Sequence, residues 1–370
     1  MHVVLEPRYS GAEILVRDLV RIQAGEGNRT SIVAFRPSQS DFLGELNELK
    51  ERGCELHIPE RSLEKWGRVK WVSASVKAAK PDIIFAHSFL PSVYARLALR
   101  LTRHPAIVTV LHTNEDLADP VLLRMERFLS SRNACVVGVS PKSVENYRSR
   151  MGSRVPLWVV QNGIDAELFA RPGRDHKRWR AEIYSPKDGE IIALQVGRIA
   201  IQKQQHVSVE ALVRLHADGM CNVRLVLAGV CEDAAYREKV LQCARDGGVE
   251  DKVQLVGPQK NIGEMLAGAD IFLMPSAWEA HSVAALEALA SGVFCVFSGI
   301  EAFAEIRSFP GVEMIGAPPA ADELGACIGG LARSKVWEQR FTRDLGRYSI
   351  SRCAAEYMRI ARNPAGAAPV

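Results

Sequence analysis

Two glutamates in one short segment could bind a ligand rich in hydroxyl groups. Residues 275–287, P-S-A-W-E-A-H-S-V-A-A-L-E, place Glu279 in a loop and Glu287 inside a predicted helix that begins near Ser282. Carboxylates accept hydrogen bonds from sugar hydroxyls, and the apolar neighbours of Glu287 mean that its charge needs a partner or a ligand. Backbone N–H groups at the start of the helix suit phosphate or carboxylate oxygens. The segment therefore predicts a ligand that carries both hydroxyls and anionic oxygens.

A second segment supplies positive charge. Residues 196–203, V-G-R-I-A-I-Q-K, end a predicted strand and enter a helix, so Arg198 and Lys203 should overhang the carboxyl edge of a sheet. Arginine offers a planar fork and lysine a mobile point charge, a pair that suits two phosphates. The alternative is an ordinary solvated loop. No G-x-G-x-x-G follows the first predicted strand, and no P-loop, G-x-S-x-G or D-x-D motif occurs. A bound diphosphate would therefore be neutralised by these cations and by helix N-termini.

Composition limits the class of protein. The chain has 370 residues, of which 47% are hydrophobic and 24% charged, as expected for two globular domains. Its 47 Lys and Arg against 43 Asp and Glu leave a formal charge of +4, too small to indicate a nucleic-acid-binding protein. No apolar run approaches the ~20 residues of a membrane helix, and the first residues do not resemble a signal peptide. Eight scattered cysteines without a C-x-x-C motif favour reduced thiols. We therefore expect a cytoplasmic protein without disulfides or a metal site.

Alternating strand and helix patterns predict an α/β protein with two doubly wound parallel sheets. In the first half, strands are predicted at 2–5, 30–35, 55–58, 82–86, 106–111, 134–139 and 157–160, and helices at 12–24, 42–52, 63–79, 92–101, 122–132 and 142–150. After a basic connection with a short helix, strands are predicted at 191–197, 223–229, 253–256, 271–274 and 294–297, and helices at 205–218, 234–246, 262–267 and 283–291. A last helix is predicted at 337–362. Ligands of such sheets bind at the carboxyl ends of strands, and two such domains favour a site in the cleft between them.

Six motifs in the same order resemble a known family. The E-x7-E pair in the setting P-S-x-x-E-x6-L-E-A-x-A-x-G, with V-G-R-x4-K upstream, resembles the retaining GT-B glycosyltransferases of glycosyltransferase family 4. Four segments of the first half are similar to that family's glycine-rich turn, its R-P-D-V-V-H-A-H strand, its T-x-H strand end and its N-G-V-D turn. They are S-G-A-E at 10–13, K-P-D-I-I-F-A-H at 80–87, V-T-V-L-H at 108–112 and V-Q-N-G-I-D at 160–165. The resemblance covers essentially the whole chain.

The resemblance implies two Rossmann-like domains that face each other across a cleft. Residues 1–166 would form an acceptor-side domain, and residues 167–340 a linker followed by a nucleotide-sugar-binding domain. Residues 341–370 would form a C-terminal helix that crosses back to the first domain. This is the GT-B architecture.

The resemblance also implies roles for the donor-side residues. Arg198 and Lys203 would bind the diphosphate, Glu279 the hydroxyls of the donor sugar, and Glu287 the ribose. Residues 280–283 would line the same site. They comprise Ala280, His281, Ser282 and Val283.

The same reasoning assigns residues of the first half. Gly11 would let the first loop approach the donor phosphates, and His112 would hydrogen-bond to the transferred sugar near the reaction centre. With Arg198, Lys203 and Glu279, His112 completes the predicted catalytic set. Asn114, Glu115 and Asp116 follow it and are candidates for contact with the acceptor.

This chain departs from the family pattern at three donor-side positions. Ala280 and Ser282 stand where glycine is common, and His281 stands where phenylalanine is frequent. Backbone N–H donation survives alanine or serine if φ is negative, although the pocket becomes narrower or more polar. His281 is either a further sugar contact or a solvent-side loop residue.

The resemblance implies a retaining transfer of a hexose or N-acetylhexosamine from a nucleotide-diphosphate sugar, with a UDP-sugar favoured. The acceptor would be a hydroxyl of a glycan, a glycolipid or a small molecule, and no metal or further cofactor is expected. A nucleotide-sugar 2-epimerase, a phosphorylase and a non-catalytic nucleotide-sugar-binding protein are the alternatives.

The helix predicted at 63–79 leaves the membrane open as a partner. Its basic residues accompany Trp66 and Trp71, a combination that suits the anionic inner face of a membrane. The alternative is an ordinary amphipathic helix in which Trp66, Val72 and neighbouring valines form the buried face.

Overall fold

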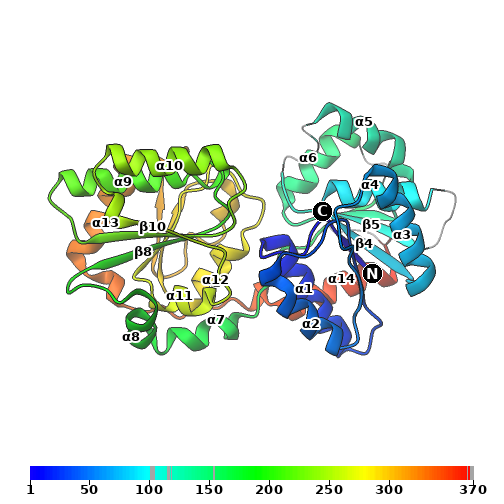
Figure 1. Ribbon diagram of the computed structural model, residues 1–370, viewed down its shortest axis with the longest axis horizontal. Coiled ribbons are helices and arrows are strands. Elements are labelled where there is room, and N and C mark those ends of the chain that lie inside the picture. The colour runs from blue at the N-terminus through cyan, green and yellow to red at the C-terminus, as the bar shows by residue number, and fades with distance from the viewer. Residues whose placement is uncertain (101–104, 115–116, 118, 153–154, 365, 367–370) are drawn as a thin grey trace. The chain divides into compact units, whose positions relative to one another are not determined.

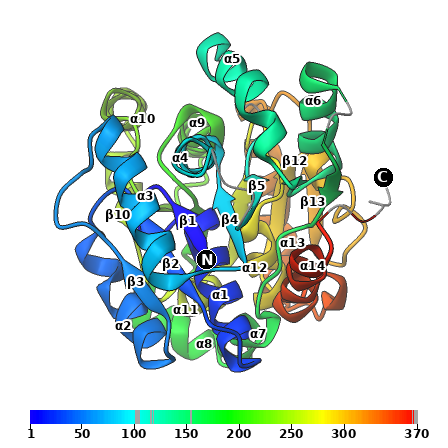
Figure 2. The same cartoon turned by 90° about the vertical axis from the view of Figure 1, so that its right-hand side faces the viewer.

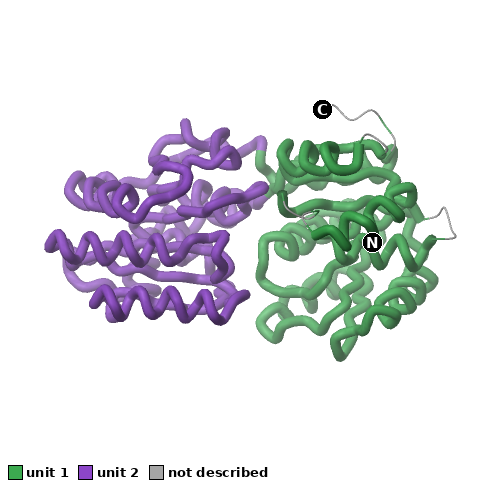
Figure 3. The backbone as a smooth tube through the Cα atoms, turned by 90° about the horizontal axis from the view of Figure 1, so that it is seen from above, with its two compact units in different colours: residues 1–163, 348–370 green, residues 164–347 purple. Residues whose placement is uncertain are grey.

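The chain forms two compact units in a computed structural model. The structure describes residues 1–370 except 101–104, 115–116, 118, 153–154, 365 and 367–370. Unit 1 comprises residues 1–163 and 348–370, and unit 2 comprises residues 164–347 (Figure 3). The chain therefore passes from unit 1 to unit 2 and returns to unit 1 at its end.

Unit 1 contains a parallel sheet with the order β3-β2-β1-β4-β5-β6-β7. Its strands are β1 (His2–Val4), β2 (Ser31–Ala34), β3 (Glu55–His57), β4 (Ile83–His87), β5 (Ala106–Leu111), β6 (Cys135–Gly138) and β7 (Leu157–Val159). Every strand pair is parallel, and the order reverses between β1 and β4. The predicted doubly wound α/β fold is confirmed for this unit.

Helices cover both faces of that sheet (Figures 1 and 2). One face packs against α1 (Gly11–Gly25), α2 (Leu43–Glu51) and α14 (Ile350–Arg362). The other packs against α3 (Lys65–Ala79), α4 (Phe89–Ala98), α5 (Pro120–Leu129) and α6 (Pro141–Met151). Because both faces are covered, the central strands are mostly apolar, as their sequences predict.

Unit 2 repeats this topology with the order β10-β9-β8-β11-β12-β13. Its strands are β8 (Ile191–Val196), β9 (Val223–Ala228), β10 (Val253–Gly257), β11 (Ile271–Met274), β12 (Phe294–Ser298) and β13 (Val312–Ile315). One face carries α9 (Gln205–Ala217), α10 (Ala234–Asp246) and α13 (Ala321–Ser334). The other carries α7 (Ala166–Gly173), α8 (His176–Trp179), a π-helical turn at Arg180–Tyr184, α11 (Ile262–Gly268) and α12 (Val283–Ser291).

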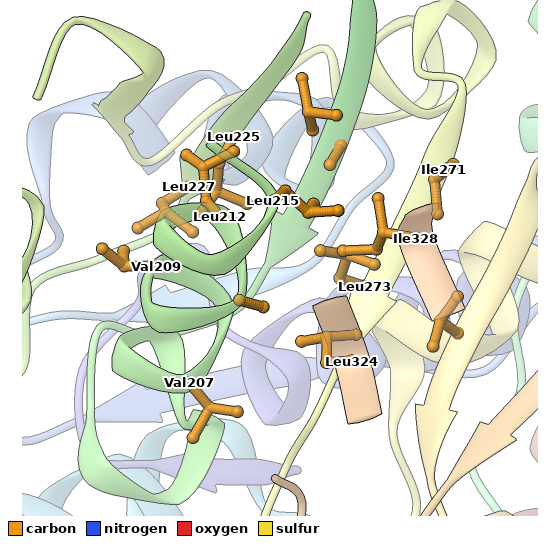
Figure 4. Close-up of a cluster of buried hydrophobic side chains, with 14 of the residues drawn as sticks. Val207, Val209, Leu212, Leu215, Leu225, Leu227, Ile271, Leu273, Leu324 and Ile328 are labelled. Atoms are coloured by element: carbon orange, nitrogen blue, oxygen red, sulfur yellow. The ribbon is translucent and has the colours of Figure 1, made fainter. Parts of the chain in front are cut away.

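The core of unit 2 shows why its strands read as apolar runs. Ile271 and Leu273 of β11 point to the face covered by α9 and α13, where they meet Leu324 and Ile328 (Figure 4). Phe272, between them, lies on the opposite face and is also fully buried. A strand that is buried on both faces has no polar alternation.

Helix α14 belongs to unit 1 and closes its core. Ile350, Ala354 and Tyr357 are buried in one cluster with side chains of α1, β4 and β5. The helix approaches Gly163 so closely that a Cβ atom there would lie 2.7 Å from the carbonyl oxygen of Ser349. A side chain at residue 163 would push this end of the helix away.

The structure corrects the helix prediction for the tail. Residues 337–349 hold only short 3₁₀ turns at Val336–Glu338 and Gly346–Tyr348, and the α-helix begins at Ile350. The intervening segment is held by arginines. Arg340 donates to the carbonyls of Ala267 and Ala269, and Arg343 donates to the carbonyls of Leu289, Val293, Pro310 and Gly311. These tertiary hydrogen bonds outweigh local helix propensity.

The structure differs from the sequence-based prediction at two further points: it contains a strand and a helix that were not predicted, and it exposes Trp66. Strand β13 and helix α13 were not predicted. The alternative that placed Trp66 in the buried face of α3 is wrong, because this side chain is 79% exposed, whereas Val72 of the same helix is buried. All eight cysteines are free, as expected. Within the part of the chain that the structure describes, no helix has the length and apolar character needed to cross a membrane.

Candidate functional site

The candidate donor-binding residues of unit 2 follow the two strands where the sheet reverses its order. β8 and β11 are neighbours, and their carboxyl ends lead into residues 197–203 and 275–282. In doubly wound sheets this switch point is where ligands bind, because the connections leave on opposite faces and open a crevice. The topology therefore brings together the two segments that the sequence singled out.

Close backbone packing shapes the loop after β8. A Cβ atom on Gly229, after β9, would lie only 2.0 Å from the carbonyl oxygen of Gly197, so only glycine fits there. The methylene stem of Lys203 covers Gly197, where an added Cβ atom would lie 3.1 Å from Cε. These two glycines let the loop fold tightly and turn Lys203 inward.

Lys203 and Glu279 form a buried ion pair across the switch point. Lys203 Nζ donates to Glu279 Oε1 at 2.5 Å, and each residue is only 8% exposed. Burying two charges costs desolvation energy, which only close pairing and good geometry offset. Lys203, which was predicted to bind the diphosphate, and Glu279, which was predicted to bind the donor sugar, are thus each other's partners in this structure.

Backbone and amide hydrogen bonds fix the positions of both loops. Gln195 Nε2 donates to the carbonyl of Lys203 at 2.7 Å, and the backbone N–H of Ala277 donates to the carbonyl of Gln202 at 2.9 Å. Gln202 Nε2 donates to the carbonyl of Trp278 at 2.8 Å. The ion pair is therefore held from both sides.

Arg198 lies at the rim of this group. Its guanidinium donates to Glu232 at 2.5 Å and to Gln202 Oε1 at 3.0 Å, and its side chain is 32% exposed. Sequence reasoning missed both partners. Gln202 stood unassigned inside the V-G-R-x4-K motif, and Glu232 follows the end of a predicted strand at the same sheet edge, a position that could have drawn attention.

The segment after β11 provides a capped helix N-terminus. Ser282 is the N-cap of α12, with φ −79°, and its Oγ accepts from the backbone N–H of Ala285 at 3.3 Å. Neither Ala280 nor Ser282 has a positive φ, so the backbone donation that glycine allows elsewhere is also available here. Ala280 and Val283 are buried at the start of the helix.

Glu287 and His281 lie at intermediate depth. Glu287 is half-buried on α12, one helical turn beyond Val283. His281 is also half-buried, and burial lowers its pKa to about 4, so its ring is neutral at pH 7. Both interpretations of His281, a further sugar contact and a solvent-side loop residue, stay predictions.

The candidate residues of unit 1 follow the strands at its own switch point and the next strand. Gly11 is the first residue of α1, and the Ser10 hydroxyl before it donates to Glu13 instead of capping the helix. His112 directly follows β5, and its Nε2 lies 3.0 Å from Nδ1 of His87, the last residue of β4.

The predicted acceptor segment is only partly described. Asn114 Oδ1 accepts from Ser143 Oγ at 2.8 Å, and the Asn114 carbonyl accepts from Asn146 Nδ2 at 2.9 Å, so α6 holds this residue. Glu115 and Asp116 lie outside the described residues. Among the residues that are described, no group of three His, Cys, Asp or Glu side chains has the arrangement of a metal site.

Sequence models of known protein families match both units of the chain. A sequence model described as Glycosyltransferase Family 4 matches residues 9–168, and one described as Glycosyl transferases group 1 matches residues 177–325. The first matches most of unit 1 and the second most of unit 2.

The curated relatives are distant in sequence, and their names agree with the two family models. The chain is 26% identical over 231 residues to N-acetyl-alpha-D-glucosaminyl L-malate synthase of Bacillus anthracis, covering 62% of this chain and 57% of that protein. It is 25% identical over 236 residues to UDP-Gal:alpha-D-GlcNAc-diphosphoundecaprenol alpha-1,3-galactosyltransferase of Escherichia coli, covering 61% and 59%. The chain thus spans less than two thirds of the length of these two relatives.

Solved structures show the same fold over the full length. The Anabaena protein HepE in complex with UDP and glucose has a TM-score of 0.75 at 18% identity, covering 98% of both chains. Sucrose-phosphate synthase from Thermosynechococcus elongatus has a TM-score of 0.79 at 17% identity, covering 98% of this chain and 97% of its own. With both units matched in order by the family's two sequence models, the chain belongs to glycosyltransferase family 4 and has the GT-B fold.

Proposed function

We propose that the protein transfers a hexose or N-acetylhexosamine from a nucleotide-diphosphate sugar to a hydroxyl acceptor. The observation that carries the proposal is the meeting of Arg198, Lys203 and Glu279 at the β8–β11 switch point. Two cations and a carboxylate at a sheet edge match the anionic and hydroxyl parts of such a donor.

A UDP-sugar is the favoured donor. The similar fold of Anabaena HepE is solved with UDP and with UDP-glucose, and the Escherichia coli relative is named for a UDP-Gal substrate. The latter acts on a lipid diphosphate-linked sugar, which supports a sugar-bearing acceptor for this chain.

The buried ion pair suggests how the donor is received. When a diphosphate approaches, Lys203 exchanges part of its bond to Glu279 for phosphate oxygens, and Glu279 is released to accept from sugar hydroxyls. In the same way, Arg198 leaves Glu232 and pairs with phosphate oxygens. Loss of the Arg198–Glu232 ion pair costs little free energy because the pair lies at a solvated rim. The neutral ring of His112 contacts the transferred sugar, and Glu287 the ribose.

The reaction is proposed to retain anomeric configuration by a front-face route. The bond from the sugar C1 to the diphosphate oxygen breaks as the bond from C1 to the acceptor oxygen forms. The acceptor proton passes to the departing diphosphate oxygen. Arg198, Lys203 and the N-terminus of α12 stabilise the charge that develops there.

Arg198→Ala and Lys203→Ala are each expected to lower kcat/KM by two to three orders of magnitude, or about 3–4 kcal/mol, because each removes a cation from the leaving group. The donor is first identified by thermal shift with UDP-, GDP- and ADP-sugars, because a bound ligand raises the melting temperature. Arg245→Ala, which breaks an exposed ion pair with Glu238 in the same unit, is the matched control.

Near-wild-type turnover in both variants would refute this assignment. Product analysis separates the alternatives: transfer requires an acceptor, a 2-epimerase changes the donor without one, and a phosphorylase requires inorganic phosphate. A donor that binds without any turnover would favour a binding protein.

Lys203→Met is expected to lower the free energy of unfolding by about 3 kcal/mol, because it leaves the buried carboxylate of Glu279 without its counter-ion. Adding Glu279→Gln should recover most of that loss, because the isolated charge is then gone. The donor should raise the melting temperature of neither the single nor the double variant. Urea denaturation measures the stability, and equal stability of wild type and Lys203→Met would show that the pair contributes nothing.

Transfer is expected to continue after dialysis against EDTA, because the two basic side chains neutralise the diphosphate. The measurement compares initial rates before dialysis, after dialysis and after return of Mg²⁺. Complete loss of the rate, reversed by Mg²⁺, contradicts metal independence.

A basic, tryptophan-bearing helix supports contact with an anionic membrane. Trp66 is 79% exposed on α3, and Lys65, Lys70 and Lys77 of the same helix are exposed as well. An exposed indole beside lysines suits the interface of a bilayer with anionic headgroups. Such contact would bring the enzyme to a lipid-linked acceptor.

Co-sedimentation with phosphatidylcholine vesicles is expected to rise when anionic phosphatidylglycerol is included and to fall at high salt. Trp66→Ser should reduce it, whereas Leu168→Ser, which removes an exposed apolar side chain of unit 2, should not. Equal sedimentation of the two variants would exclude α3 as the contact.

A further inference from the structure

Three histidines cross the sheet of unit 1 in a line. His2 begins β1, His87 ends β4, and His112 follows β5. His2 pairs in register with Phe85, and His87 pairs with Val110. Because residues two apart on a strand share a face, all three histidines lie on the face that α1 and α14 cover.

Hydrogen bonds join these rings into one chain that ends at α1. His2 Nδ1 lies 2.9 Å from His87 Nε2, and His87 Nδ1 lies 3.0 Å from His112 Nε2. At the other end, His2 Nε2 lies 2.9 Å from Oε1 of Gln23, which is 4% exposed. The ring nitrogen left outside this chain is Nδ1 of His112. We call these four residues the histidine relay.

The rings of the histidine relay are neutral at pH 7. Burial lowers the pKa of His2 to about 3 and that of His112 to about 4, and it lowers the pKa of His87 well below its ordinary value. A neutral imidazole has one N–H and one lone pair. Each ring must therefore donate on one side and accept on the other, and all the hydrogen bonds must run in the same direction.

The amide of Gln23 sets that direction. Its Oε1 accepts, so His2 carries its proton on Nε2 and receives a hydrogen bond at Nδ1 from His87. By the same reasoning His87 and His112 carry their protons on Nε2. All three rings then have the tautomer that neutral histidine prefers in water, and His112 presents a lone pair at Nδ1.

We propose that Gln23, His2 and His87 are positioning residues that hold His112 as an acceptor for a hydroxyl of the transferred sugar. This inference rests on the proposed function, because the ligand of His112 is taken from it. The histidine relay explains why polar rings occupy an otherwise apolar layer, where each would be costly without a partner. It also makes His112 selective for a hydroxyl over a group that only accepts hydrogen bonds.

The experiment reads the tautomers directly. Long-range ¹H–¹⁵N correlation spectra of protein labelled with ¹⁵N-histidine distinguish a protonated ring nitrogen from a bare one, and single-histidine variants assign the signals. We expect protons on Nε2 of all three rings. Addition of the donor found by thermal shift should move the Nδ1 signal of His112.

Gln23→Met removes the amide and keeps a side chain of similar size. His112 should then populate both tautomers, and kcat/KM should fall about two- to tenfold, as for one weakened neutral hydrogen bond. His87→Leu, which cuts the chain at its middle, should lower kcat/KM at least as far. Tyr357→Phe is the matched control, because this residue stacks on His87 with ring centroids 6.4 Å apart and its hydroxyl has no hydrogen-bond partner among the described residues.

A proton on Nδ1 of His112 in the wild type overturns the inference. So does a Gln23→Met variant with unchanged tautomer and unchanged kcat/KM. The expected tautomers without turnover of any nucleotide sugar would count against the proposed function and still support the histidine relay, because the spectra do not depend on activity.

Discussion

The site of unit 2 depends on the buried ion pair between Lys203 and Glu279. A buried pair is seldom worth its desolvation energy as a stabilising device, so its presence calls for another reason. Here the pair holds a cation and a carboxylate at the junction of two loops. Without its partner, either buried charge would carry a large desolvation penalty. A ligand with phosphates and hydroxyls can satisfy both groups at once, so the groups are kept in place until it binds.

That pair requires close backbone packing around it. Gly197 and Gly229 allow the loops after β8 and β9 to touch, and the stem of Lys203 then lies along Gly197. Ser208 Oγ donates to Gln195 Oε1 at 2.8 Å, and Gln195 in turn donates to the Lys203 carbonyl. The positions of the charges are thus set by small residues and neutral amides.

Prediction from sequence succeeded where burial dictates the pattern. The strands at 106–111 and 271–274 and the helices at 234–246 and 283–291 agree with the structure to the residue. Strand β13 was not predicted because it is a half-exposed edge strand that contains Glu313. Helix α13 was not predicted because three glycines weaken its helical pattern. The ion pairs could not be predicted, since Glu232 and Glu279 meet their partners only through the order of the strands.

The substitution of the common glycines by Ala280 and Ser282 has a physical consequence at the start of α12. Glycine would leave this segment free to adopt many backbone conformations, whereas alanine and serine restrict it before any ligand binds. Ser282 also accepts the N–H of Ala285, which leaves fewer unpaired N–H groups in the first turn. The helix N-terminus is therefore stiffer and offers its remaining N–H groups in a fixed direction. This segment would therefore lose less conformational entropy when a ligand binds to it than a glycine-containing segment would.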